Sequence, residues 1–174
     1  MSELPGVEVG DRDAAAPPQP IVLVLDNLRS AYNVGNIFRL AEICGIERII
    51  TCGYTATPPH PKLVKTARGC DTLVPCEHQP TGLAAVEALQ AESYRVFAVE
   101  TMTEAPPVWD VGYELPVAFV FGNEALGLGP ETLARCDAIV RLPVFGRKNS
   151  LNVSNCAAVV VYTVIRQLQE AGRV

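Results

Sequence analysis

The chain has 174 residues, of which 49% are hydrophobic and 19% are charged, and its formal net charge is −5. This length suits one domain with a full hydrophobic core, and the composition excludes a disordered polymer. The negative net charge argues against a protein that coats nucleic acid non-specifically, although it leaves room for a local basic patch. The sequence shows no signal peptide, and no apolar run approaches the roughly 20 residues of a membrane span. We therefore expect a cytoplasmic protein with no membrane partner.

Residues 1–20 combine prolines, alanines and acidic residues without periodicity, which predicts a disordered N-terminal tail before a single domain at residues 21–174. From residue 21 onward, short β-rich runs alternate with helical patterns. Strands are expected at residues 21–25, 48–52, 72–75, 95–99, 117–121 and 138–142. Helices are expected at residues 35–44, 61–68, 81–92, 130–135 and 153–170.

Several of these boundaries have a local physical cause. Gly45 and Gly69 follow their helices, where a left-handed residue is favoured. Thr81 suits a helix N-cap, and Pro130 suits a first helical position. The strands IVLVL and VAFVF are apolar on both faces, which is typical of a parallel sheet covered by helices on both sides. The alternation predicts an α/β domain with a single open, mostly parallel sheet.

Six cysteines raise the question of disulfides or a metal site: Cys44, Cys52, Cys70, Cys76, Cys136 and Cys156. None of them forms a CxxC pair. Grouping Cys70 and Cys76 with His78, and with His60 as a fourth ligand, fits no common zinc spacing. We therefore expect buried free thiols in a reducing compartment, and no metal.

The loop after the first expected strand, at residues 26–39, is rich in polar side chains. Asn36 and Arg39 share one helix face at i and i+3, and Gly35 lets the backbone come close to another part of the structure. Asparagine and glycine are ordinary turn residues, and a helix arginine is usually solvated, so this loop alone leaves a purely structural role open. Arg39 lies in a mostly apolar helix, which favours a position near an interface.

The loop at residues 121–130 contains three glycines within eight residues and follows an apolar strand. Such a loop either wraps a flat ligand or is an ordinary flexible connection. Glu124 at its centre favours a cleft. The glycines do not fit the GxGxxG dinucleotide fingerprint, and the chain has no GxxxxGK[ST] phosphate loop. A Rossmann-type dehydrogenase is therefore disfavoured.

A third polar loop, at residues 147–155, leads into the last expected helix. Ser150, Asn152, Ser154 and Asn155 place four small polar side chains within six residues. One of them is expected to cap the helix, and a single cap does not need all four.

Together the three loops resemble the signature motifs of the SpoU (TrmH) family of RNA 2′-O-ribose methyltransferases, in the SPOUT superfamily. The family elements N-x-G-x-x-x-R, G-x-E…G and S-x-N-x-S are matched in that order by Asn33, Gly35 and Arg39; by Gly122, Glu124, Gly127 and Gly129; and by Ser150, Asn152 and Ser154. The resemblance covers nearly all of residues 21–170.

The resemblance implies a C-terminal deep trefoil knot, which hydrophobic spacing could not reveal. It also implies a homodimer whose active site lies at or near the subunit contact, and S-adenosyl-L-methionine as cofactor. The cofactor contacts that it assigns are Val99, Thr101, Gly122, Asn123, Leu142, Ser150, Leu151 and Asn152.

The residues that the resemblance assigns to catalysis are Arg39, Asn33, Glu124, Ser150 and Asn152. Arg39 matches the family's catalytic arginine, which is often proposed as the general base. A guanidinium normally stays protonated, so the alternative is that Arg39 binds an RNA phosphate and stabilises developing alkoxide charge, with proton removal left to a phosphate oxygen or water. Asn33 and Asn152 would orient the ribose and Arg39, while Glu124 would organise the cleft through hydrogen bonds to backbone or to Asn33.

The expected RNA contacts are cationic: Arg29, Lys62, Lys65, Arg68, Arg147 and Lys148. Three of these lie at i, i+3 and i+6 of one short helix, where a solvated helix face is the alternative. The chain is nearly a bare catalytic domain, which favours transfer RNA, with the D-loop guanosine as target. The alternatives are a ribosomal RNA methyltransferase and a catalytically inactive knotted RNA-binding protein. Retention of Arg39, Glu124 and Asn152 argues against the inactive protein.

Overall fold

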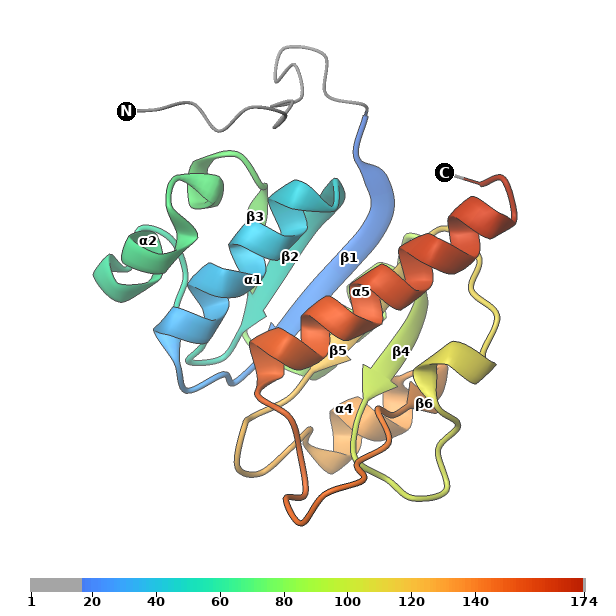
Figure 1. Ribbon diagram of the computed structural model, residues 1–174. Helices are drawn as coiled ribbons and strands as arrows, with labels where there is room; N and C mark the ends of the chain where they lie inside the picture. Colours follow the sequence, from blue (N-terminus) through green and yellow to red (C-terminus); the bar gives the residue numbers. More distant parts are fainter. Residues whose placement is uncertain (1–16, 174) are drawn as a thin grey trace, which may run out of the picture.

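The computed structural model describes residues 17–173, in which strands and helices alternate (Figure 1). In chain order the elements are β1 (Gln19–Asp26), α1 (Ala31–Ile43), β2 (Ile46–Cys52), α2 (Pro61–Ala67), the 3-10 helix η2 (Cys70–Thr72), β3 (Cys76–Gln79), α3 (Gly82–Ala91), β4 (Arg95–Val99), the 3-10 helix η3 (Val108–Asp110), β5 (Val117–Phe121), α4 (Pro130–Arg135), β6 (Ala138–Val140) and α5 (Val153–Glu170). β1 begins two residues before the predicted start of the domain. Most of the predicted tail, residues 1–16, lies outside the described residues.

The six strands form one sheet in the order β3-β2-β1-β5-β4-β6, and every neighbouring pair is parallel. Because all strands point the same way, their carboxyl ends lie along one edge, at the bottom of Figure 1. The chain returns from β4 to β5, beside β1, so loops that are far apart in sequence meet at that edge. The predicted α/β class is confirmed.

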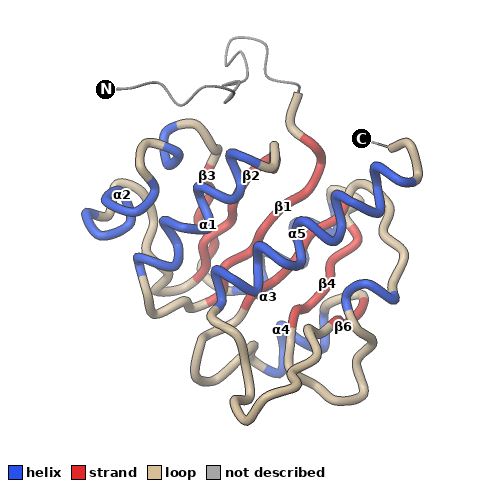
Figure 2. Tube along the Cα trace, viewed as in Figure 1, coloured by secondary structure: helices blue, strands red, loops and turns tan. Residues whose placement is uncertain are grey.

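Helices cover both faces of the sheet (Figure 2). Successive side chains of a strand pack alternately on the two sides. Leu23 and Leu25 of β1 pack in the core under α1 and α5. Val22 and Val24 pack on the opposite side with residues of α3. A strand buried on both faces has no polar side, which explains the continuous apolar run in its sequence.

The predicted helix ends are largely confirmed. Thr81 Oγ1 accepts a hydrogen bond from Ala84 N at 3.1 Å, and Pro130 occupies the first turn of α4. Gly45 has φ +61° directly after the C-cap of α1. That helix begins at Ala31, four residues earlier than predicted, because Ser30 caps it by accepting from Asn33 N.

Two strand predictions need correction. The strand expected at residues 72–75 is wrong, because this region holds η2 and a turn, and β3 runs over Cys76–Gln79 instead. β3 is a short polar edge strand whose position is set by its ladder with β2 rather than by any apolar pattern. β6 ends at Val140, since Arg141 forms only an isolated bridge with Pro107. The 3-10 helix η3 was not predicted.

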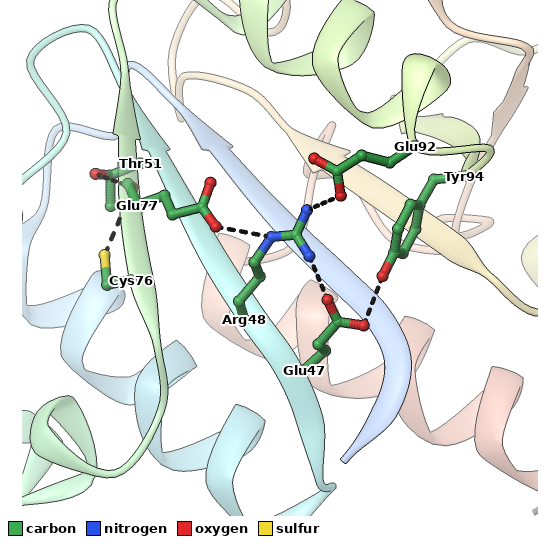
Figure 3. A network of polar contacts seen from close by, with 7 residues as sticks. All are labelled: Glu47, Arg48, Thr51, Cys76, Glu77, Glu92 and Tyr94. Atoms are coloured by element: carbon green, nitrogen blue, oxygen red, sulfur yellow. Dashed lines mark hydrogen bonds and ion pairs between the residues drawn. The ribbon is translucent and has the colours of Figure 1, made fainter.

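A largely buried arginine of β2, Arg48, joins this strand to β3 and to the end of α3 (Figure 3). The side chain of Arg48 is 11% exposed and forms ion pairs with Glu47, with Glu77 of β3 at 3.1 Å and with Glu92 at the end of α3 at 2.5 Å. Burial opposes the charged form of Arg48, but the surrounding carboxylates outweigh it and raise its pKa. Tyr94 Oη donates to Glu47 at 2.5 Å and extends the cluster.

The segments that follow β4 and β6 are held together by backbone hydrogen bonds. Arg141 N donates to Pro106 O at 3.0 Å, and Val108 N donates to Arg141 O at 2.9 Å. The trefoil knot expected for this region stays a prediction.

None of the helices within residues 17–173 has the length and hydropathy needed to cross a membrane.

Gly35 lies where α2 packs most closely against α1. A Cβ atom at Gly35 would lie 2.0 Å from Thr66 Oγ1 and 2.5 Å from Leu63 O. The sequence-based inference that Gly35 permits a close backbone approach is therefore right, and the neighbour is helix α2.

We expect Gly35→Ala to lower the free energy of unfolding by about 1–3 kcal/mol, as overpacking does, although alanine in a helix normally stabilises. Urea denaturation followed by circular dichroism measures this. Gly112→Ala is the matched control, since a Cβ at Gly112 meets nothing within 4 Å. Equal stabilities of the two variants would contradict the steric explanation.

Candidate active site

A cavity of about 1050 Å³ opens at the carboxyl edge of the sheet. Its walls are the loops that follow β1, β4, β5 and β6, together with the first turns of α5. The volume lies at the upper end of the roughly 300–1,000 Å³ typical of ligand pockets. Open parallel sheets commonly bind ligands at this edge, beyond the carboxyl ends of their strands.

The structure brings together most of the residues singled out from the sequence. All eight predicted cofactor contacts line the cavity: Val99, Thr101, Gly122, Asn123, Leu142, Ser150, Leu151 and Asn152. Four of the five predicted catalytic residues also line it: Asn33, Glu124, Ser150 and Asn152. Arg39 does not.

A chain of hydrogen bonds joins the three motif loops inside this cavity. Asn152 Nδ2 donates to Asn33 Oδ1 at 3.2 Å, and Asn33 Nδ2 donates to Glu124 Oε1 at 3.1 Å. Glu124 also accepts from the backbone N–H groups of Arg29 at 2.8 Å and Ser30 at 3.2 Å. The hydrogen bonds predicted for Glu124, to backbone and to Asn33, are both present.

These donors keep Glu124 ionised. Partial burial on its own would raise the pKa of this carboxyl, but the backbone N–H of Arg29, its own N–H, the Asn33 amide and the Ser30 N–H together lower it below the usual value. The contribution of these bonds to stability is therefore present near neutral pH and is lost only as the pH falls through that lowered pKa. A carboxylate whose oxygens already accept these bonds is a poor proton acceptor, so its geometry suits orientation of other groups.

The loop after β5 owes its shape to Asn123 and Gly122. Asn123 is buried, and its Nδ2 donates to Asn27 O at 2.9 Å and to the Tyr54 hydroxyl at 2.5 Å. Its Oδ1 accepts from the two backbone N–H groups that follow Glu124, which fixes the turn. A Cβ at Gly122 would lie 2.6 Å from Gly127 C, so only glycine lets the two arms of the loop meet.

Three further residues that line the cavity were not among the predicted site residues: Glu100, Trp109 and Cys156. Glu100 accepts a hydrogen bond from Leu128 N at 2.6 Å, which ties the loop after β4 to the loop after β5. Trp109 is the single tryptophan of the chain and is about half exposed. Burial, reinforced by the Glu100 charge, raises the pKa of Cys156 to about 12, so its thiol stays protonated. Glu100 directly follows β4, and this position could have identified it from the sequence. No local pattern in the sequence marks Cys156.

Arg39 lies on the exposed side of α1, away from the cavity of its own chain. Its guanidinium acts instead on Cys70 in η2, where it opposes the rise in thiol pKa that burial and Glu42 cause. Within one chain, Arg39 therefore does not line the cavity that Glu124 and Asn152 line, and its catalytic role stays a prediction. The i, i+3 spacing correctly placed Arg39 and Asn36 on one exposed face, and it carries no information about what that face meets.

The predicted RNA-binding cations divide into two groups. Arg29 and Lys148 line the cavity. The other four are exposed and lie outside the cavity: Lys62, Lys65, Arg68 and Arg147. Two of these, Lys62 and Lys65, belong to α2, and Arg68 is its C-cap residue. Within residues 17–173 none of these four forms an ion pair, so their charges are available to solvent or a polyanion.

No group of three or more His, Cys, Asp or Glu side chains in the described part of the chain is arranged to hold a metal ion. The six cysteines are free thiols; Cys52 is buried and the others are partly buried.

Asn152 has two separable roles, because its Oδ1 also caps α5 by accepting from Ser154 N at 3.0 Å and Asn155 N at 3.4 Å. We expect Asn152→Ala to lower the free energy of unfolding by about 1 kcal/mol. Asn152→Ser should retain the cap, and therefore the stability, while losing the bond to Asn33. Urea denaturation compares the two; equal destabilisation by both would show that the cap is not what alanine removes.

Comparison with known proteins agrees with this geometry. The SpoU rRNA Methylase family matches residues 20–162. The 23S rRNA (uridine(2479)-2′-O)-methyltransferase of Streptomyces viridochromogenes is 30% identical over 149 residues, which are 83% of this chain and 52% of that protein. The tRNA (guanosine(18)-2′-O)-methyltransferase of Thermus thermophilus is 28% identical over 152 residues, 87% of this chain and 77% of that protein.

The crystal structure of the SpoU methyltransferase AviRb from Streptomyces viridochromogenes, in complex with AdoMet, superposes with a TM-score of 0.80 at 25% identity. That match covers 92% of this chain and 65% of AviRb. The chain thus spans about half the length of the 23S rRNA methyltransferase to which it is similar. Since the family matches most of the residues and each of the three motifs contributes residues to one cavity, the chain belongs to the SpoU rRNA Methylase family.

Proposed function

We propose that this protein transfers a methyl group from S-adenosyl-L-methionine to a ribose 2′-hydroxyl of RNA. The observation that carries the proposal is the convergence of Asn33, Glu124, Ser150 and Asn152, from three separate loops, on a single cavity. Two relatives whose sequences align with most of this chain are RNA 2′-O-methyltransferases.

The residues present fit the proposed cofactor. The cavity has room for a nucleoside with an amino-acid tail, and Gly122 and Gly127 expose backbone along one wall. Val99 and Leu142 supply apolar surface for a flat base, and the carboxylate of Glu100 favours a cation. When bound, the cofactor supplies an electrophilic methyl carbon on a sulfonium.

The remaining task falls to the side chains, because a ribose hydroxyl is very weakly acidic and must be held in line with the methyl carbon. Asn33 and Asn152 are mutually oriented by their hydrogen bond and would position the ribose. Glu124 holds Asn33 in place and stays ionised, so we assign it to orientation rather than to proton removal.

Arg39 enters this scheme through a second copy of the chain. Since its guanidinium lies outside the cavity of its own chain, we propose a homodimer in which Arg39 of one subunit reaches the cavity of the other. There its fixed positive charge would bind an RNA phosphate and stabilise the developing alkoxide. Proton removal would fall to a phosphate oxygen or water.

Transfer RNA, at a D-loop guanosine, is the substrate that we propose first. The alignment spans 77% of the tRNA (guanosine(18)) relative and 52% of the 23S rRNA relative. Ribosomal RNA is the second candidate, because the rRNA relative has the higher identity, 30% against 28%.

Incubating the protein with methyl-labelled cofactor and total RNA, followed by mapping of the labelled nucleotide, tests the proposal. Label should enter a 2′-O-methylated nucleotide of transfer RNA. In parallel, the fluorescence of Trp109 should change on adding S-adenosyl-L-methionine and stay constant on adding NAD, because Trp109 lines the cavity. RNA binding without label transfer would instead indicate a catalytically inactive RNA-binding protein.

We expect Arg39→Ala to reduce methyl transfer at least 100-fold while the Trp109 fluorescence titration with cofactor stays unchanged, since Arg39 does not line the cavity. Single-turnover assays measure the loss. Arg166→Ala is a control for removing an exposed arginine, since within residues 17–173 the ion-pair partner of Arg166 is Glu170 on the same helix. A turnover near that of the wild type would remove Arg39 from the mechanism.

Mixing two inactive variants distinguishes action between subunits from action within one. A heterodimer of Arg39→Ala with the cavity variant Gly122→Val contains one composite site with both an intact cavity and an intact Arg39, if the arginine crosses the interface. We expect the mixture to recover part of the wild-type activity. Without recovery in a mixture shown to contain heterodimers, Arg39 must act on its own subunit's cavity.

A further inference from the structure

Two large apolar side chains in the loops that line the cavity are almost fully exposed. Phe145 is 92% exposed and Leu126 is 86% exposed, the highest values for large hydrophobic residues in the described part of the chain. Each lies within a loop whose residues line the cavity on both sides of it: Val144 and Lys148 around Phe145, and Glu124 and Gly127 around Leu126. Figure 1 shows both loops at the carboxyl edge of the sheet, after β5 and after β6.

Their exposure has no explanation in the fold. A single exposed hydrophobic residue is common, but these two lie in two loops that line the same cavity, so a ligand in that cavity could cover both. Neither side chain belongs to either core cluster. Removing them should therefore cost the folded state little.

The charges beside Phe145 indicate what covers it. Arg147 and Lys148 follow it within three residues, and Lys148 lines the cavity together with Arg29. Cations beside an exposed aromatic ring are the combination that binds single-stranded nucleic acid, with phosphates on the cations and a base stacked on the ring. A second copy of this loop would bring like charges together, which disfavours contact between two copies of the same loop.

We propose that Phe145, assisted by Leu126, holds an unpaired nucleobase at the cavity mouth, beside the ribose that is methylated. The inference rests on the proposed function and narrows its substrate to nucleotides in loops or single strands. Bases within an A-form duplex are stacked on one another, so an aromatic side chain reaches a base face only where the base is splayed out. Stacking tolerates every base, so this contact selects structure rather than sequence.

The test uses a fluorescein-labelled oligo(U) of about 12 nucleotides, alone and paired with oligo(A). Phe145→Ala should weaken binding of the single strand roughly 5- to 100-fold, as expected for the loss of one stacked base, and leave duplex binding unchanged. Phe145→Trp should restore binding of the single strand, and Leu126→Ala should weaken that binding less than Phe145→Ala does. Leu73→Ala, at a residue that is 67% exposed and outside the cavity lining, is the matched control and should bind as the wild type does.

Three results would overturn the inference: wild type that does not bind oligo(U), Phe145→Ala that binds it as tightly as wild type, or equal losses for single strand and duplex. A change in sedimentation mass in Phe145→Ala would assign the side chain to a contact between protein chains instead. Failure of the proposed function looks different, because the wild type would then methylate no RNA. If the wild type methylates RNA and Phe145→Ala does so with an unchanged KM, only the inference about Phe145 fails.

Discussion

The bond from the Asn152 amide to Asn33, continued by the bond from Asn33 to Glu124, is the constraint on which the rest of the site depends. It joins residues up to 119 positions apart in the sequence. The backbone N–H groups just before α1 hold the Glu124 carboxylate in place. That carboxylate orients the Asn33 amide, which in turn orients the Asn152 amide. A change at any one of the three positions therefore disturbs the other two loops.

The parallel sheet makes this arrangement possible, because it delivers the ends of β1, β4, β5 and β6 to one edge. β1 and β5 are neighbours although some ninety residues separate them in sequence, so Asn33 and Glu124 meet across adjacent strand ends. Helix α1 contributes residues to three parts of the structure. It presents Asn33 to the cavity, seats α2 against Gly35 and carries Arg39 on its outer face. One rigid helix thus connects the cavity to the outer face that carries Arg39.

Local patterns predicted much of this fold. The bounds of β4, β5, α4 and α5 coincide with those expected. Proline and glycine flank β5, Pro130 begins α4, and Asn152 caps α5. β3 was placed wrongly, since its sequence CEHQ has no apolar pattern and its strand conformation comes from pairing with β2. The cluster around Arg48 was equally invisible, because three carboxylates from separate elements surround one guanidinium only after folding.

The sequence by itself determined the α/β class, the motif side chains and their spacing, and hence which residues were available for the site. The tertiary structure alone decided which of them meet. It joined Asn33, Glu124 and Asn152, added Glu100 and Trp109, exposed Phe145 at the mouth and left Arg39 outside. The physical reason is that hydrophobic periodicity indicates only which face of a helix or strand is buried, over one or two turns of the chain. The order of strands in the sheet, which sets distances across the site, arises from non-local packing that no local pattern contains.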